Sequence, residues 1–319
     1  MYAAAVRRRR ERYAGRPDLR RRLRHPVISV GNLAVGGRGK TPLAASIARL
    51  LRGLGERPAI LSRGYARAQP DEGVVVVRDA DGIRADLARS GDEPLMLARQ
   101  LPGVAVLVCP DRYVAGRFAE HHLGASVHIL DDGFQHLQLD RDIDLLIVGR
   151  EDIEHPLTLP LGRLREPLDT IVAADAVLTP DADVVIDARG SDLPVFQLRR
   201  SGSFEPVDDQ PALAVAGIAA PERFFADLRA NGWTLAETMV FPDHHRYTSH
   251  DVSRMVRAAA RTKAVRIATT EKDFVRLLPL RPFALPVVHV PITLEPDPID
   301  LFRDWIVKEL RTVRGGADG

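Results

Sequence analysis

The residues best suited to chemistry in this sequence form a glycine-rich segment that ends in a lysine and a threonine. A β-branched run over residues 27–30 leads into the segment, and a helical pattern follows it. Glycines let the backbone bend until several N–H groups point at one phosphate, and a helix N-terminus adds partial positive charge. The pattern therefore predicts a phosphate-binding P-loop. The residues of this predicted loop are Gly36, Gly37, Arg38, Gly39, Lys40, Thr41 and Pro42.

Each end of this loop has a predicted role. Lys40 would reach the β- and γ-phosphates of a nucleotide, and the hydroxyl of Thr41 would bind Mg²⁺. Pro42 suits a first helical turn, where its missing N–H costs nothing. Ala34 lies where the usual pattern has its first glycine. The alternative is a glycine-rich turn followed by Lys-Thr by chance.

A pair of carboxylates follows a second apolar strand. Asp131 and Asp132 close the run over residues 127–130, at a position where a P-loop protein holds Mg²⁺. Turn chemistry alone also favours such a pair. Gln135 and His136 follow at once, and they could face the phosphates or the phosphate acceptor.

A second carboxylate could handle a proton. Asp92 precedes Glu93 and Pro94, so it could simply cap a helix, or it could accept the proton of a hydroxyl acceptor. His244 and His245 close a strand pattern far along the chain, and at most one of them would face a site. That histidine could orient the Asp92 carboxylate or share its proton.

Charged loops supply the remaining candidates. Arg63 follows the strand predicted over residues 58–62. Arg165 could clamp a phosphate, and Glu166 could contact a second Mg²⁺ or the acceptor, although a surface ion pair explains both equally well. Residues 270–273, Thr-Glu-Lys-Asp, end another strand and are typical of a helix cap.

Predicted strands alternate with predicted helices along most of the chain. This alternation indicates an α/β fold whose parallel sheet is flanked by helices, as in P-loop kinases. Ligands in such folds bind beyond the carboxyl ends of the strands, where the candidate residues fall. The 319 residues favour about two domains. We expect a basic arm (1–24), a P-loop domain (25–190) and a smaller α/β domain (191–319) that includes a helix over residues 299–310 and contributes to the acceptor site and its closure.

The composition and the distribution of charge limit the kinds of binding partner that we expect. Residues 7–24 contain ten arginines against two acidic residues, although the whole chain carries a net charge of only +2. Such an arm could meet an anionic surface, either lipid headgroups or nucleic acid, or remain solvated. The rest of the chain is acidic and has no aromatic basic groove, so nucleic acid is not expected. Cys109 is the single cysteine, and no apolar run approaches the roughly 20 residues of a membrane span.

Seven motifs together resemble the tetraacyldisaccharide 4′-kinase (lipid A 4′-kinase) family. They are Gly31-Asn32 with Gly36 to Pro42, Ser62 to Tyr65, Gly91 to Pro94, Asp131 to His136, Gly162 to Pro167, Phe241 to His245 and Thr270 to Asp273. The first glycine of the usual P-loop pattern is also absent in that family. Its members are P-loop kinases with two α/β domains.

The resemblance implies an activity and a location. The γ-phosphate of ATP would be moved, with Mg²⁺, to the 4′-hydroxyl of a tetraacylated glucosamine disaccharide 1-phosphate to give lipid IVA. The enzyme would be peripheral on the cytoplasmic face of the bacterial inner membrane, without an obligate protein partner. Asp92 would be the general base, helped by His244, and Lys40, Thr41, Asp131, Asp132, Arg165 and Glu166 would complete the site.

Two other functions fit the P-loop. One is a phosphotransferase with a soluble acceptor, and the other is a regulatory ATPase at a membrane surface. Switches of the second kind carry a lysine early in the loop, and no lysine precedes Lys40 in this chain. The acceptor that stimulates ATP turnover would separate these functions.

Overall fold

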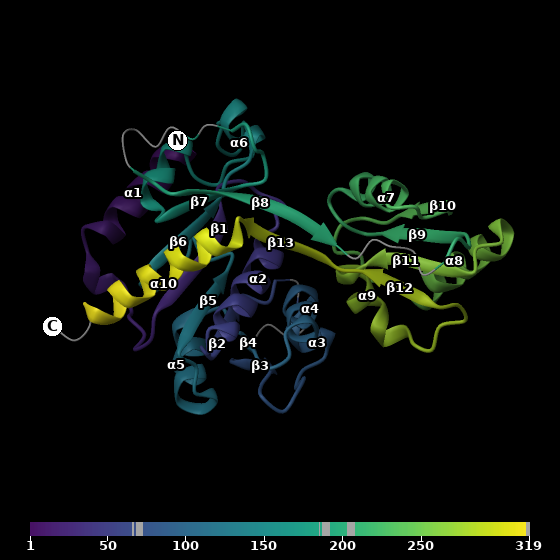
Figure 1. Cartoon of the computed structure of the whole chain (residues 1–319), viewed down its shortest axis with the longest axis horizontal. Coiled ribbons are helices and arrows are strands. Elements are labelled where there is room, and N and C mark those ends of the chain that lie inside the picture. Colours follow the sequence, from purple (N-terminus) through teal and green to yellow (C-terminus); the bar gives the residue numbers. More distant parts are fainter. Residues whose placement is uncertain (66, 68–72, 185, 187–191, 203–207, 317–319) are drawn as a thin grey trace.

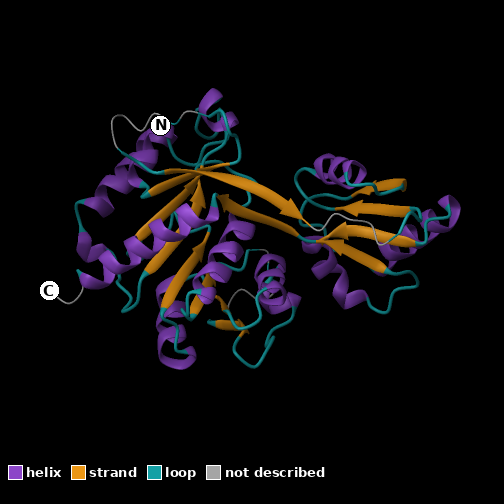
Figure 2. Ribbon diagram, in the orientation of Figure 1, coloured by secondary structure: helices purple, strands orange, loops and turns teal. Residues whose placement is uncertain are grey.

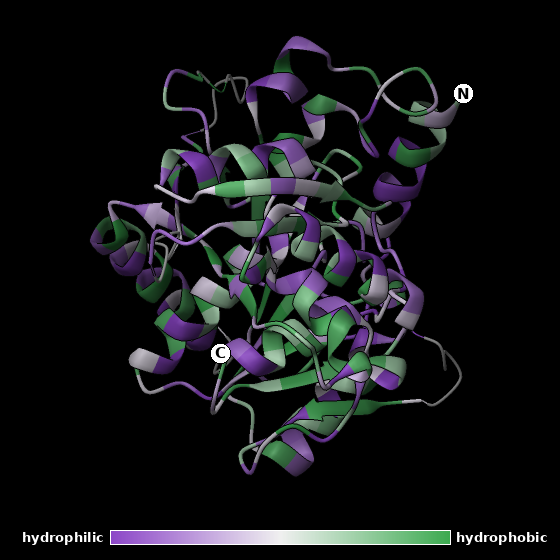
Figure 3. Ribbon diagram, turned by 90° about the vertical axis from the view of Figure 1, so that its right-hand side faces the viewer, coloured by the Kyte–Doolittle hydropathy of each residue, from purple (hydrophilic) through white to green (hydrophobic). Residues whose placement is uncertain are grey.

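The computed structural model describes residues 1–65, 67, 73–184, 186, 192–202 and 208–316. They form two α/β lobes of unequal size (Figure 1 and Figure 2). Two long strands cross from one lobe to the other side by side and join them. The strands of both lobes carry many of the buried apolar residues, and hydrophobic stretches lie on several strands in the view along the long axis (Figure 3). None of the helices in these residues is long and apolar enough to span a bilayer.

The larger lobe is built on a nine-stranded sheet in the order β13-β8-β7-β6-β1-β5-β2-β4-β3. All neighbours from β8 to β4 are parallel, whereas β13 and β3 run antiparallel at the two edges. The predicted α/β class is therefore confirmed. The strands are β1 (Val27–Asn32), β2 (Pro58–Ser62), β3 (Val75–Arg78), β4 (Ala105–Val108), β5 (Val127–Asp131), β6 (Ile143–Ile147), β7 (Ala176–Thr179), β8 (Val195–Gly202) and β13 (Ile292–Asp297).

Helices cover both faces of this sheet. On one face, α2 (Lys40–Gly53), α4 (Asp92–Gln100) and α10 (Ile299–Gly315) bury apolar side chains in one core with the strands. On the other face, α5 (Arg112–Leu123) packs with Leu23, and residues 164–174 form a further cluster with Phe134. The shorter helices are α3 (Leu87–Ser90), α6 (Arg150–Glu154), η1 (Pro17–Leu19) and η2 (Leu168–Ala173).

The smaller lobe has a four-stranded parallel sheet in the order β10-β9-β11-β12. Phe224, Phe225 and Leu228 of α7 pack on one face, and Met255 and Ala258 of α8 pack on the other. Its elements are β9 (Ala212–Ala216), α7 (Pro221–Ala230), β10 (Leu235–Val240), α8 (Ser249–Thr262), β11 (Arg266–Thr270), α9 (Glu271–Leu277), η3 (Leu278–Leu280) and β12 (Val287–Val290).

The end of the chain corrects the expected domain limits. We expected residues 191–319 to form the second domain, but β8, β13 and α10 belong to the larger lobe. The apolar face of α10, with Phe302, Ile306 and Leu310 buried, finds its partner in the larger core, and β13 pairs with β8. The smaller lobe is thus inserted between β8 and β13. The predicted boundary, residues 190 and 191, lies outside the described residues.

The N-terminal segment is also more ordered than a solvated arm. Residues Tyr2–Ala14 form α1, which has no buried residue. Six of the ten arginines in residues 7–24 pair with carboxylates of this chain, so part of the local charge is neutralised internally. They are Arg7, Arg10, Arg16, Arg20, Arg21 and Arg22.

Candidate active site

The glycine-rich segment links β1 to α2 as the P-loop pattern predicts. Helix α2 begins at Lys40, two residues before the predicted start, so Pro42 still lies in the first turn, where no intrahelical N–H bond is lost. Gly39 has φ 86°, and a Cβ there would lie 2.5 Å from Cδ2 of Leu294 on β13. The backbone angle therefore favours glycine, and a larger residue would also have to displace the Leu294 side chain. Ala34 forms a backbone bridge to Leu164, and its methyl group is buried in the apolar cluster that contains Phe134.

The side chains at the start of α2 contact residues at the ends of β1 and β5. Lys40 Nζ donates to Asn32 Oδ1 at 3.1 Å and to the Gly36 carbonyl at 3.3 Å, and it lies 3.7 Å from Asp132 Oδ1. Thr41 Oγ1 donates to Asp131 Oδ2 at 3.0 Å. The lysine, the threonine and both aspartates that the sequence proposed are thus brought together.

The threonine–aspartate pair fits a Mg²⁺ ion. Asp131 is buried, and burial together with the nearby carboxylates of Glu93 and Asp132 raises its pKa to about 7. A divalent cation bound there would offset this accumulation of negative charge, and Mg²⁺ normally takes one or two protein oxygens besides phosphate and water. No group of three His, Cys, Asp or Glu side chains suited to a metal occurs among the described residues.

The other two predicted metal ligands have different partners. Asp132 accepts from Arg165 Nη2 at 2.7 Å and Nη1 at 3.0 Å, and the Arg165 side chain lowers the pKa of Asp132 against the effect of burial. Glu166 is buried, and its Oε2 accepts from Arg10 Nε at 2.9 Å. Burial raises the pKa of Glu166. These carboxylates are held by arginines of the chain itself.

The remaining predicted residues surround the P-loop unevenly. Arg38 pairs with Asp152 and Glu151 of α6 at 2.7 and 3.0 Å, and Gln135 donates to the Asn32 carbonyl at 3.1 Å. His136 is half-buried, and burial with the charge of Arg112 lowers its pKa to about 4. Arg63 is exposed, and in the described residues the polar contacts of Lys40 are with Asn32, Gly36 and Asp132 rather than with Arg63.

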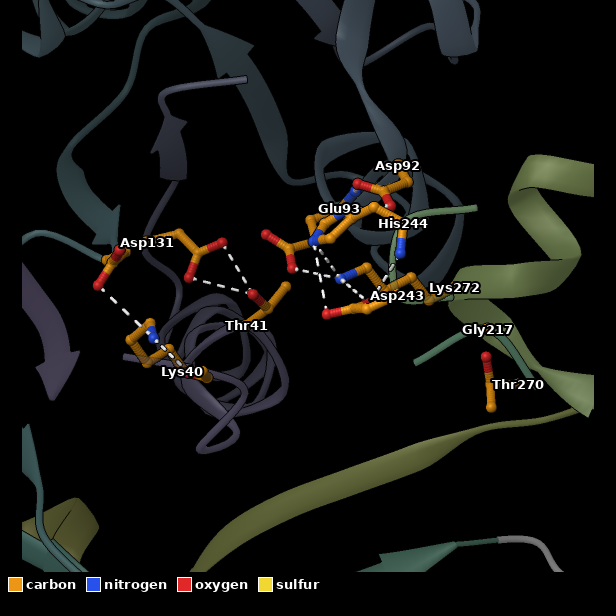
Figure 4. A network of polar contacts seen from close by, with 12 residues as sticks. Lys40, Thr41, Asp92, Glu93, Asp131, Gly217, Asp243, His244, Thr270 and Lys272 are labelled. Atoms are coloured by element: carbon orange, nitrogen blue, oxygen red, sulfur yellow. Dashed lines mark hydrogen bonds and ion pairs between the residues drawn. The ribbon is translucent and has the colours of Figure 1, made fainter. Parts of the chain in front are cut away.

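Where the two lobes meet, Asp92 contacts His244. Asp92 is the first residue of α4, and its Oδ2 lies 3.1 Å from His244 Nδ1, although 152 positions separate the two residues. His245 instead contacts Asp251, which leaves His244 as the histidine at this carboxylate. Figure 4 shows this pair on one side of Glu93, with Thr41 and Asp131 on the other.

Residues that follow three parallel strands of the smaller lobe form the polar network around Asp92. Gly217 follows β9, His244 follows β10, and α9 follows β11. Lys272 Nζ lies 3.1 Å from His244 Nε2 and 3.0 Å from Glu93 Oε1. Burial would raise the pKa of Asp92, but the hydrogen bond with His244 and the charges of Lys272 and Arg276 hold it well below its usual value.

Sequence reasoning missed two arginines of this site. Arg276 of α9 bonds to Asp92, and its one signal is that it lies three residues after Asp273 on a helix that follows a strand. Arg112, the first residue of α5, is buried at the same sheet edge, where burial and Arg63 lower its pKa. The signal for Arg112 is its place directly after Asp111, a residue type that favours a helix N-cap.

These features define a P-loop kinase of the α/β class. The parallel sheet carries a P-loop after β1 and a buried carboxylate after β5, and an aspartate–histidine pair faces them. The family model described as tetraacyldisaccharide-1-P 4′-kinase matches residues 1–311, and the chain belongs to that family.

Curated relatives and a solved structure agree. A tetraacyldisaccharide 4′-kinase of Syntrophus aciditrophicus is 36% identical over 92% of this chain and 87% of its own length. That of Geobacter metallireducens is 39% identical over 88% of this chain and 86% of its own length. The crystal structure of LpxK from Aquifex aeolicus in complex with ATP has a TM-score of 0.80 and 30% identity, and it covers 97% of this chain and 96% of that one. This chain is therefore an enzyme of the kinase class.

Proposed function

We propose that this enzyme transfers the γ-phosphate of ATP to the 4′-hydroxyl of a tetraacylated glucosamine disaccharide 1-phosphate, with Mg²⁺, to form lipid IVA. The observation that carries the proposal is the Asp92–His244 pair, which two lobes assemble beside the P-loop. The names of the relatives and the ATP in the Aquifex aeolicus structure support the same donor and acceptor.

On this proposal the P-loop N–H groups and Lys40 bind the β- and γ-phosphates, and Thr41 and Asp131 hold the metal. Mg²⁺, when bound, neutralises charge on the β- and γ-phosphate oxygens. Asn32 Nδ2 is buried without a hydrogen-bond partner among the described residues, so it is free to donate to a phosphate oxygen. Fixed donors of this kind stabilise the charge that develops during transfer.

Asp92 then receives the acceptor hydroxyl. As the hydroxyl oxygen bonds to the γ-phosphorus, the bond from that phosphorus to the β–γ bridging oxygen breaks and ADP leaves. The hydroxyl proton passes to the Asp92–His244 pair. Phosphoryl transfer places little demand on the strength of the base, so the pair acts mainly by positioning the hydroxyl.

We also propose that the enzyme is peripheral on the cytoplasmic face of the inner membrane, with α1 against the anionic lipids. Arg8 and Arg12 of α1 are exposed and make no ion pair among the described residues, so they are available to lipid headgroups. Each basic residue near such a surface contributes about 1 kcal/mol. Flotation with anionic vesicles should therefore fall when both arginines are replaced by alanine, and retained salt-sensitive flotation would contradict this attachment.

The acceptor decides the function. Purified enzyme with ATP and Mg²⁺ is given tetraacyldisaccharide 1-phosphate in detergent micelles, its deacylated form, or no acceptor. We expect phosphorylation of the acylated substrate alone, and loss of that activity by about 10²–10³-fold in Lys40→Ala. Turnover with water alone would indicate a regulatory ATPase, and equal turnover of the deacylated disaccharide would indicate a soluble acceptor.

A further inference from the structure

Arg276 reaches from the smaller lobe to the carboxylate of Asp92 in the larger lobe. Its Nε donates to Asp92 Oδ2 at 2.8 Å, and its Nη2 lies 2.6 Å from the same oxygen. Both side chains are buried, with 4% and 8% of their surfaces exposed. The contact spans 184 positions in the sequence, and α9 packs directly on α4.

The guanidinium of Arg276 is itself fixed within the smaller lobe. Its Nη1 donates to the Gly217 carbonyl at 2.7 Å and to Asp273 Oδ1 at 3.0 Å. Asp273 is fully buried and also accepts from Tyr247, Thr270 and the Gly217 N–H. Because the guanidinium is planar, these bonds to Nη1 also fix the direction of Nε and Nη2. These two nitrogens therefore face Asp92 in a single orientation.

The two oxygens of Asp92 are thereby made unequal. Oδ2 receives Arg276 and His244, which occupies its lone pairs. Oδ1 accepts only the N–H of Glu93, at 2.9 Å, among the described residues. A carboxylate oxygen can accept two hydrogen bonds, so Oδ1 has one direction left for an incoming hydroxyl.

We propose that Arg276 is a positioning residue for phosphoryl transfer, which fixes Asp92 so that the acceptor hydroxyl binds Oδ1. This inference rests on the proposed role of Asp92 as the group that receives the hydroxyl. Because Arg276 belongs to the smaller lobe, Asp92 is aligned only while α9 lies against α4. The acceptor-binding oxygen is therefore set by contact between the lobes, although the carboxylate belongs to the P-loop lobe.

Arg276 also contributes charge. The groups facing Asp92 are Glu93 from α4, Asp243 and His244 from the loop after β10, and Lys272, Asp273 and Arg276 from α9. Burial raises the pKa of Asp92, and the charge of Arg276 lowers it. Without that charge the pKa of Asp92 should rise, so Asp92 should gain a proton at higher pH. The acid limb of the kcat/KM profile should then move to higher pH.

The test compares Arg276→Gln with Gln100→Ala. Gln100 lies on α4 and donates to Glu271 of α9 at 2.5 Å, so its loss removes a contact between the same two helices without touching Asp92. We expect Arg276→Gln to lower kcat with the lipid acceptor by about 10²-fold, to leave the KM for ATP unchanged, and to move the acid limb upward. Gln100→Ala should change none of these values.

A conservative variant separates charge from geometry and serves if Arg276→Gln folds poorly. Arg276→Lys keeps the positive charge but loses the planar guanidinium with its several donors. The acid limb of its kcat/KM profile should therefore stay near that of the wild type, while its kcat should recover only in part. The inference is overturned if Arg276→Gln and Gln100→Ala lower kcat equally with the acid limb unmoved. Wild-type turnover of the lipid acceptor and its loss in Lys40→Ala test the proposed function separately.

Discussion

At the scale of single residues, Asp92 and His244 meet where the two lobes touch, and we expect them to act together. Asp92→Ala and His244→Ala should each lower kcat strongly and leave ATP affinity nearly intact, because the partners of both side chains in the described part of the chain lie outside the P-loop. Since each needs the other, the double variant should be little worse than the poorer single variant. Steady-state kinetics and ATP binding measure both effects. Multiplicative losses would mean independent roles, and a near-normal Asp92→Ala would leave Asp92 with a structural role only, as the partner of Arg276 between the lobes.

A second residue-scale effect concerns pH and stability. Burial and the charge of Arg112 keep His136 neutral in the folded enzyme down to a pKa of about 4, whereas an unfolded histidine titrates near 6.5. Between these values the unfolded chain binds more protons, so the free energy of unfolding should fall as pH drops from about 6.5 to about 4. Urea unfolding at several pH values should show a smaller fall in His136→Gln. Parallel curves for the two proteins would contradict this assignment.

At the scale of elements, α1 has an exposed side and a side that contacts two loops of the site. These are the loops that contain Gln135 and Glu166. Arg10 pairs with the buried Glu166, and Arg9 donates to the Gln135 carbonyl. Arg10→Ala leaves a buried carboxylate without its charge partner and should cost about 2–3 kcal/mol in the free energy of unfolding, somewhat less than a fully buried pair. Arg12→Ala removes the same charge from an exposed position and should stay within about 0.5 kcal/mol of the wild type. Equal losses in urea unfolding would show that α1 acts only through its net charge.

The elements also show what local sequence can predict. Strand β2 has the limits predicted from the sequence, residues 58–62, because turn residues and the apolar run mark both of its ends within one short window. Strands β8 and β13 were missed. Their pairing joins residues 90 to 100 positions apart, and β13 contains Pro296, which argues against a strand unless it lies at an edge.

The residues of the site likewise divide into those that local sequence predicts and those that depend on long-range contacts. The P-loop, Asp131 and Asp132 were predictable, since each lies at the end of a strand with a clear pattern. Arg276 was not, because its bond to Asp92 depends on how two lobes meet. Asp132 and Glu166 were proposed as metal ligands, yet the structure gives both an arginine partner from elsewhere in the chain. Local patterns placed these charges correctly but could not identify their partners.

At the scale of the whole molecule, the larger lobe depends on the last elements of the chain. A truncation after Pro291 removes β13 and α10, and with them the buried side chains of Leu294, Phe302, Ile306 and Leu310. Burial of each side chain contributes roughly 1.5–3 kcal/mol, so the loss matches the whole stability of an ordinary domain. We expect this truncation to abolish cooperative unfolding of the larger lobe. A chain ending at Gly315 keeps α10 and should unfold like the full chain. Cooperative unfolding of both truncations would contradict the assignment of α10 to the larger core.

The insertion of the smaller lobe between β8 and β13 also sets an order in time. A ribosome that has made β8 must add 89 further residues, from 203 to 291, before β13 begins, which takes on the order of 10 s. During this interval the β8 edge and the sheet face that α10 later covers stay open in the nascent chain. The smaller lobe, whose sheet ends at β12, has all its strands first. The lobe that starts first is therefore the last to be completed, and the nucleotide-binding loop, against which Leu294 packs, is among the last parts of the enzyme to reach its final surroundings.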